Sequence, residues 1–106
     1  MKIYVIKGGG FCKIGRAKDV RRRLRGLQTG NPFNLRIVFE SEVPDEESFQ
    51  VEQVAHGIMG TPTIHGGEWF KTKWELAARA VTAAAKQVGT NRGTGIDGLG
   101  FAGSQK

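Results

Sequence analysis

Two short apolar segments joined by three consecutive glycines open the chain and constrain its fold more than any other feature. The sequence begins MKIYVIKGGGFCKIG, residues 1–15. β-Branched and aromatic residues on both sides of a glycine-rich turn are typical of a β-hairpin. Because side chains alternate along a strand, we expect Tyr4 and Ile3 on opposite faces, and likewise Lys13 and Ile14.

A short helix is predicted directly after this hairpin. Asp19 is a favourable N-cap residue. Val20, Leu24 and Leu27 then recur at helical spacing and form one apolar stripe. The segment QTGNP, residues 28–32, supplies a glycine and a proline that end the helix.

The rest of the chain predicts one more strand and two more helices. Residues 34–43 read as a strand in which Ile37 and Phe39 share a face. A helix is expected over 44–60, where proline and acidic residues favour a helix start. A loop and a short extended piece lead to the last helix, 72–89. The predicted order is ββαβαα, an α+β fold with a small sheet covered by helices.

The composition changes at the C-terminal end. Six of the last 18 residues are glycine, and Ile96, Leu99 and Phe101 are the only sizeable apolar side chains among them. Such a segment buries too little apolar surface to offset the entropy of ordering. We therefore predict one domain over residues 1–89 and a flexible tail over residues 90–106.

Positive charge is concentrated in one stretch of the chain. The net charge is +6, from sixteen basic and ten acidic residues, and residues 13–25 hold seven of the bases and one of the acids. The remainder is neutral. A local basic surface favours a polyanionic partner, most often nucleic acid. The alternative is a solvated helix face.

The cellular compartment is predicted from what the chain lacks. Cys12 is the single cysteine, so no disulfide can form within the chain, which fits a reduced cytoplasmic compartment. No apolar run approaches roughly 18 residues, so no membrane span is expected. The apolar stretch at the N-terminus is too short for a signal peptide.

Helix geometry separates the arginines of the basic stretch. At about 100° per residue, Arg22 and Arg25 face water and Arg21 is intermediate. Arg23 lies about 40° from Leu27 and leans over the sheet. We expect Arg22 and Arg25 to make loose phosphate contacts that carry affinity. Arg23 either aims a bidentate donor at one phosphate or merely covers apolar surface.

One glutamate stands apart from the others. Glu68 lies in HGGEWF, between glycines and two large aromatic residues. It is suited to hold Mg²⁺, which takes few protein carboxylates, and the alternative is a salt bridge to Arg16 or Arg23. A metal-bound carboxylate, an arginine and a base, Tyr4 or Lys13, can together hydrolyse a phosphodiester.

These residues carry a family resemblance. IYVI at 3–6, CKIGRAKDVRRRLRGLQTGNP at 12–32 and GEWF at 67–70 resemble the GIY-YIG endonuclease superfamily, and most of all its phage-T5-type branch. The resemblance runs from residue 1 to about residue 82. It implies a three-stranded antiparallel sheet flanked by helices, DNA cleavage in a bacterial cell or phage-infected host, and one divalent ion, Mg²⁺ or Mn²⁺.

The resemblance also implies roles by position. Tyr4, Lys13 and Arg23 take catalytic positions, and Glu68 takes the metal-binding position. Lys13 stands where other members carry an aromatic residue, which leaves the identity of the general base open. Candidate DNA contacts are Arg16, Lys18, Arg21, Arg22 and Arg25.

Two histidines are lesser candidates. His56 lies four residues after Glu52 on a predicted helix, where a hydrogen bond between the two is the simplest role. His65 is close to Glu68 in sequence and is either a metal neighbour or a solvated loop residue. Two other functions stay open: a nucleic-acid-binding module with a GIY-YIG fold and little or no cleavage, and a basic RNA-binding protein unrelated to this superfamily. Specificity would require a protein partner or a homodimer.

Overall fold

The predicted N-terminal hairpin is present, and it forms the centre of the sheet. In the computed structural model, which describes residues 1–60 and 69–94, β1 (Lys2–Gly8) pairs antiparallel with β2 (Phe11–Ala17). Gly9 in the turn has φ 60°, a left-handed conformation that a residue with a side chain rarely adopts. The glycines therefore serve the turn.

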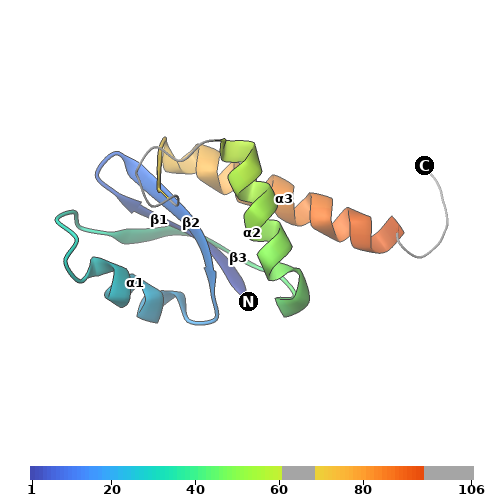
Figure 1. Ribbon diagram of the computed structural model, residues 1–106, viewed down its shortest axis with the longest axis horizontal. Coiled ribbons are helices and arrows are strands. Elements are labelled where there is room, and N and C mark those ends of the chain that lie inside the picture. Colours follow the sequence, from blue (N-terminus) through green and yellow to red (C-terminus); the bar gives the residue numbers. More distant parts are fainter. Residues whose placement is uncertain (61–68, 95–106) are drawn as a thin grey trace.

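Two further strands flank this hairpin in an antiparallel sheet of order β3-β1-β2-β4 (Figure 1). β3 (Arg36–Glu42) pairs with β1, and β4 (Trp69–Lys71) pairs with β2. The helices are α1 (Val20–Gln28), α2 (Asp45–Met59) and α3 (Trp74–Thr94). The α+β class is confirmed. The sheet has four strands rather than three because the short extended piece before the last helix pairs with β2.

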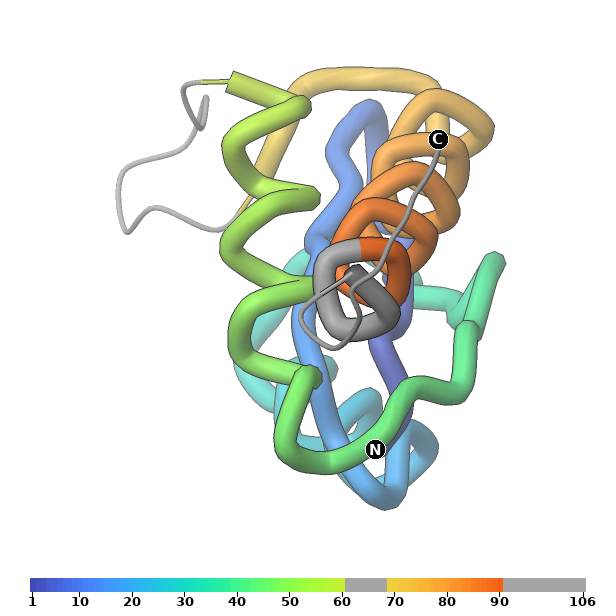
Figure 2. The backbone as a smooth tube through the Cα atoms, turned by 90° about the vertical axis from the view of Figure 1, so that its right-hand side faces the viewer, coloured from blue at the N-terminus to red at the C-terminus, as the bar shows by residue number. Residues whose placement is uncertain are grey.

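The helices cover the two faces of the sheet unequally. Figure 2 shows α2 and α3 side by side on one face, and Figure 1 shows α1 on the other. Under α2 and α3 lies the larger apolar core, which we call the α2/α3 core: its buried residues include Ile3, Val5, Cys12, Ile14, Val51, Ala55, Ala77 and Val81. The smaller cluster under α1, the α1 cluster, is built on Tyr4, Ile6, Val20 and Leu35.

The start and the end of α1 are both fixed by side chains. Asp19 is the N-cap, and its carboxylate accepts a hydrogen bond of 3.0 Å from the backbone N–H of Arg22, as predicted. At the other end, Gln28 Nε2 donates to the carbonyl of Phe33 at 2.8 Å, and Gln28 Oε1 accepts from the N–H of Leu35 at 2.9 Å. The glutamine of QTGNP thus ties the loop back to the helix.

β3 contains a bulge that the simple alternation did not anticipate. The register shifts between Val5, which pairs with Phe39, and Ile6, which pairs with Ile37. Val38 is the extra residue of this bulge, and beyond it the side chains of β3 point to the face opposite the one that simple alternation predicts. Phe39 therefore packs against the α2/α3 core while Ile37 packs against the α1 cluster, and the prediction that they share a face was wrong.

The last helix is longer than predicted. It was expected to end at Gly89 but continues to Thr94. A glycine inside a helix costs only about 1 kcal/mol, and buried Val88 holds the preceding turn against the core. The remainder of the predicted tail, 95–106, lies outside the described residues. Neither α3 nor any other helix in the described part of the chain has the length and apolar character needed to cross a membrane.

Candidate active site

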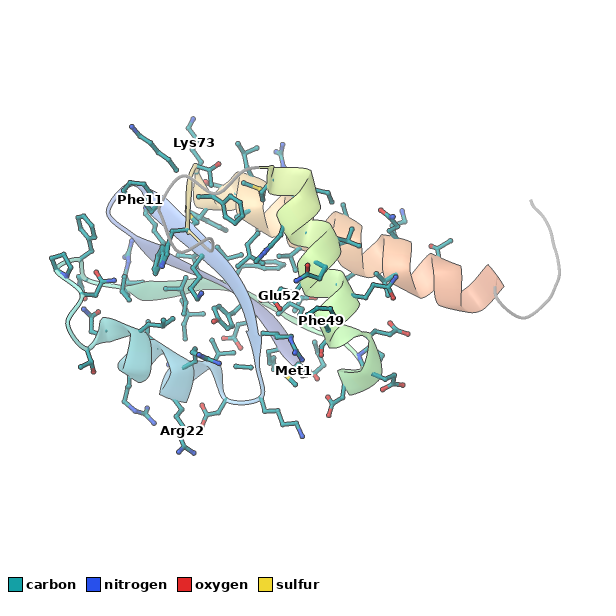
Figure 3. All side chains as sticks on the ribbon, in the orientation of Figure 1. Met1, Phe11, Arg22, Phe49, Glu52 and Lys73 are labelled. Atoms are coloured by element: carbon teal, nitrogen blue, oxygen red, sulfur yellow. The ribbon has the colours of Figure 1, made fainter. Side chains whose placement is uncertain are left out.

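The open edge of β2 is the place where the chemistry-bearing residues meet. β4 pairs with β2 only as far as Lys13, and no described strand continues along this edge. A pocket of about 400 Å³ lies there, which we call the basic pocket. Figure 3 shows Glu52 of α2 beside β2. The pocket is lined by Met1, Tyr4, Lys13, Gly15, Arg16, Ala17, Lys18, Arg23 and Glu52.

Tyr4 forms the buried wall of the basic pocket. Its side chain is 1 % exposed and lies against Gly15, its register partner on β2. A Cβ atom at Gly15 would overlap the Tyr4 hydroxyl, so only glycine lets the ring take this position. Burial raises the pKa of Tyr4, the charge of Glu52 raises it further, and the positive charge of Arg23 partly opposes the shift.

The pKa of Lys13 is shifted in the opposite direction from that of Tyr4. The Lys13 side chain is 5 % exposed, and burial lowers the pKa of its ammonium group. The negative charge of Glu52 opposes this shift, whereas Arg23 adds to it. The two candidate bases therefore differ in how readily they lose a proton. Lys13 loses its proton more easily than an exposed lysine, and Tyr4 loses its proton less easily than an exposed tyrosine.

The arginines of α1 do not share one environment. Arg23 lines the basic pocket together with Tyr4 and Lys13. Arg22 points away from the sheet into solvent (Figure 3), and Arg21 and Arg25 are likewise exposed. Their contacts with DNA stay a prediction, as do those of Lys18 and Arg16 at the pocket.

Arg16 is held by α2. Its Nε lies 3.3 Å from a carboxylate oxygen of Glu52, and its Nη1 donates to Ser48 Oγ at 3.2 Å. The Ser48 hydroxyl in turn donates to the carbonyl of Asp45 at 2.8 Å, and the Arg16 guanidinium lies over the Phe49 ring. The guanidinium therefore has a defined orientation at the rim of the pocket.

Glu52 is the charged side chain of the basic pocket that was not predicted as part of the site. The available signal was its place on the sheet-facing side of α2, between the fully buried residues Val51 and Ala55. A glutamate there needs a partner. The sequence offered His56 for this role, whereas the structure provides Arg16.

His56 instead covers the open edge of β2. Its Nε2 lies 2.8 Å from the carbonyl oxygen of Ile14. A carbonyl can only accept, so Nε2 carries the proton and Nδ1 does not in the neutral ring. The ring also packs edge-on against Phe70. These contacts give His56 a structural role beside the pocket.

Two predicted site residues, His65 and Glu68, lie outside the described residues. The chain is described again from Trp69, the residue after Glu68, and Trp69 is the register partner of Lys13. Within residues 1–60 and 69–94 there is no group of three or more potential metal-binding side chains. A Mg²⁺ site with one carboxylate and substrate phosphates does not require such a group, so the assignment of the metal to Glu68 stays a prediction.

A known protein family matches most of the chain. The model of the T5orf172 domain family matches residues 1–88. The match includes every residue that lines the basic pocket and ends at Val88, a buried residue of α3. No significant match was found among curated proteins or among solved structures.

Proposed function

The chain belongs to the T5orf172 domain family, and from the basic pocket we propose that it is a metal-dependent endonuclease that hydrolyses phosphodiester bonds in DNA. The observation that supports this most is that Tyr4, Lys13 and Arg23, from two strands and a helix, line one pocket. These are the positions to which the resemblance to GIY-YIG endonucleases assigns catalysis. The proposal includes membership of that superfamily.

Substrate binding is attributed to the positive side chains around the pocket. Arg23 is exposed at the rim and has a planar donor group that suits a phosphate. Arg16 presents a guanidinium already oriented by Ser48 and Glu52. Because each holds a fixed charge beside the same pocket, they would stabilise the negative charge that builds up on the phosphate during hydrolysis.

Lys13 is the better candidate for the general base. Water must lose a proton when it attacks phosphorus, and a base works best when its pKa is near the working pH. Burial moves the pKa of Lys13 downward, toward that range, and moves the pKa of Tyr4 away from it. In this mechanism Lys13 accepts the proton of water. Tyr4, fixed against Gly15, donates a hydrogen bond that orients the water or the phosphate.

Glu68 is proposed as the residue that holds the divalent ion. The donor set fits Mg²⁺, because one carboxylate next in sequence to the partner of Lys13 leaves coordination sites for water and phosphate oxygens. When bound, Mg²⁺ or Mn²⁺ supplies Lewis-acid stabilisation of the leaving oxyanion. Glu52 is less suitable because its carboxylate already pairs with Arg16.

A plasmid-nicking assay tests this function. Supercoiled DNA is incubated with wild-type protein, with Glu68→Ala and with Glu46→Ala, which removes an exposed glutamate of α2. We expect nicking that requires Mg²⁺ or Mn²⁺, is lost in Glu68→Ala and is retained in Glu46→Ala. Equal nicking by Glu68→Ala, or nicking that persists in excess chelator, would contradict the proposal.

A DNA-binding module with little or no cleavage is the second candidate. The burial of Tyr4, which raises its pKa and makes it a poor base, favours this alternative. Retarded migration of DNA without nicking, in wild type and in Glu68→Ala alike, is the result it predicts. RNA binding is tested in the same way, by competition with RNA of equal length.

A further inference from the structure

A small aromatic hollow lies next to the basic pocket on the same face of β2. It has a volume of about 180 Å³ and is lined by Gly8, Phe11, Asn31, Pro32, Phe33 and Trp69. Phe11 and Lys13 are successive side chains on this face, about 7 Å apart along the strand. Trp69 is the register partner of Lys13. Lys13 thus stands between the aromatic hollow and the basic pocket.

The loop wall of the hollow is built by the QTGNP segment. Gln28 Nε2 donates to the carbonyls of Asn31 at 3.3 Å and Phe33 at 2.8 Å. The Asn31 side chain accepts from the N–H of Phe33 at 2.9 Å. These bonds hold the backbone of Phe33 in place, and its ring lies over Gly9 of the hairpin turn.

The aromatic side chains of the hollow are held but not fully buried. Phe33 is 46 % exposed, and Phe11 and Trp69 are partly exposed. Trp69 packs against the α1 cluster. The α1 cluster therefore accounts for one side of the Trp69 ring, and within the described residues all three aromatic side chains keep exposed surface that a flat apolar ligand could contact.

We propose that the aromatic hollow receives one unpaired nucleobase of the strand whose phosphate lies in the basic pocket. This inference rests on the proposed function of that pocket. Aromatic rings stack on any base, the hollow has the size of a single ring system, and Arg16 and Arg23 supply positive charge in the neighbouring basic pocket. A base in continuous duplex DNA is stacked and paired and cannot enter such a hollow. The substrate class is therefore DNA with a single-stranded or extrahelical nucleotide at the cleavage position.

The test compares two single-stranded oligonucleotides of twelve nucleotides, one of thymidine and one abasic, which have the same phosphates. Dissociation constants are measured by fluorescence anisotropy in chelator, so that neither is cleaved. We expect wild type to bind the thymidine strand about 5- to 150-fold more tightly, the factor that corresponds to about 1–3 kcal/mol for one stacked base. Phe33→Leu should lose most of this preference, whereas Phe33→Tyr, which keeps the aromatic face, should retain it.

Two controls keep the test decisive. Arg22→Ala, on the solvent side of α1, should weaken binding of both strands equally. Phe11→Leu provides a second probe of the hollow if Phe33→Leu has a lower melting temperature. Equal binding of the two strands by wild type, or an unchanged preference in both leucine variants, would overturn the inference. Such a result together with metal-dependent nicking leaves the nuclease proposal standing, whereas a preference for bases without nicking removes the nuclease proposal alone.

Discussion

The two faces of β2 are built from alternating residues of one short segment and serve different purposes. Cys12 and Ile14 point into the α2/α3 core, where both are buried. Phe11, Lys13 and Gly15 face the other way and line the aromatic hollow and the basic pocket. A single step along the chain therefore separates a residue that stabilises the fold from one that we assign to chemistry.

The two faces also differ in what they bury. The α2/α3 face holds an apolar core, whereas the α1 face includes the nearly buried amine of Lys13. Burying a charge costs free energy, and a small domain is only marginally stable. The apolar face therefore provides the stability that lets the other face hold Lys13 with its lowered pKa.

The largest effect should come from Ile14, on the apolar face. Ile14→Ala removes a fully buried side chain and should lower the free energy of unfolding by about 2–5 kcal/mol. Urea denaturation measures the change. If the faces are separate in function, nicking per folded molecule stays near that of wild type. A loss of nicking without a loss of stability would show that the two faces are not separable in this way.

The next largest effect is expected at Arg23, on the α1 face of the sheet. Arg23→Ala should reduce the nicking rate by about 10²–10³-fold, as the loss of one donor to the transition state does in other enzymes. Its free energy of unfolding should change little because the side chain is exposed. Arg22→Ala, the matched control one residue away, should mainly raise the dissociation constant and reduce its salt dependence. Equal losses of nicking rate and of affinity in the two variants would mean that Arg23 has no role in catalysis beyond that of a solvent-facing arginine.

The pH dependence of the rate tests which residue is the base. A base acts after losing its proton, so the rate should rise tenfold per pH unit below the pKa of the base and level off above it. Burial lowers the pKa of Lys13, so the plateau should begin below about 10.4, the usual lysine value. Tyr4→Phe should keep this profile and Lys13→Arg should abolish it. A rate still rising above about pH 10.4 in wild type, beyond the usual lysine value, would instead indicate Tyr4, whose pKa is raised.

The features that could be predicted from the sequence are those set by local geometry. Strand alternation placed Lys13 opposite Ile14, the cap at Asp19 marked the start of α1, and helical spacing turned Arg23 toward the sheet. Each depends on residues a few positions apart, where backbone geometry leaves few alternatives.

The features that could not be predicted depend on contacts between distant segments. The pairing of β4 with β2 and the bond from His56 to Ile14 join residues more than 40 positions apart. The bulge at Val38 arises from the fit of β3 to β1, which a strand pattern does not encode. The partner of Glu52 could not be predicted either, because a carboxylate on a helix face can pair with any cation that the fold brings near it.

The Arg16–Glu52 pair should give the smallest measurable effect, at the edge where the two faces of β2 meet. A double-mutant cycle with Arg16→Ala and Glu52→Ala should yield a coupling of about 0.5–1 kcal/mol in urea denaturation, because the Glu52 side chain is only 15 % exposed. The Lys2–Glu42 pair is the matched control: its side chains are 40 % and 64 % exposed, so water screens it more and its coupling should be smaller. Equal coupling in the two pairs would mean that Glu52 is not held more firmly than a surface carboxylate. Glu52 would then be available to a metal ion or to Lys13, and its assignment as the anchor of Arg16 would have to be abandoned.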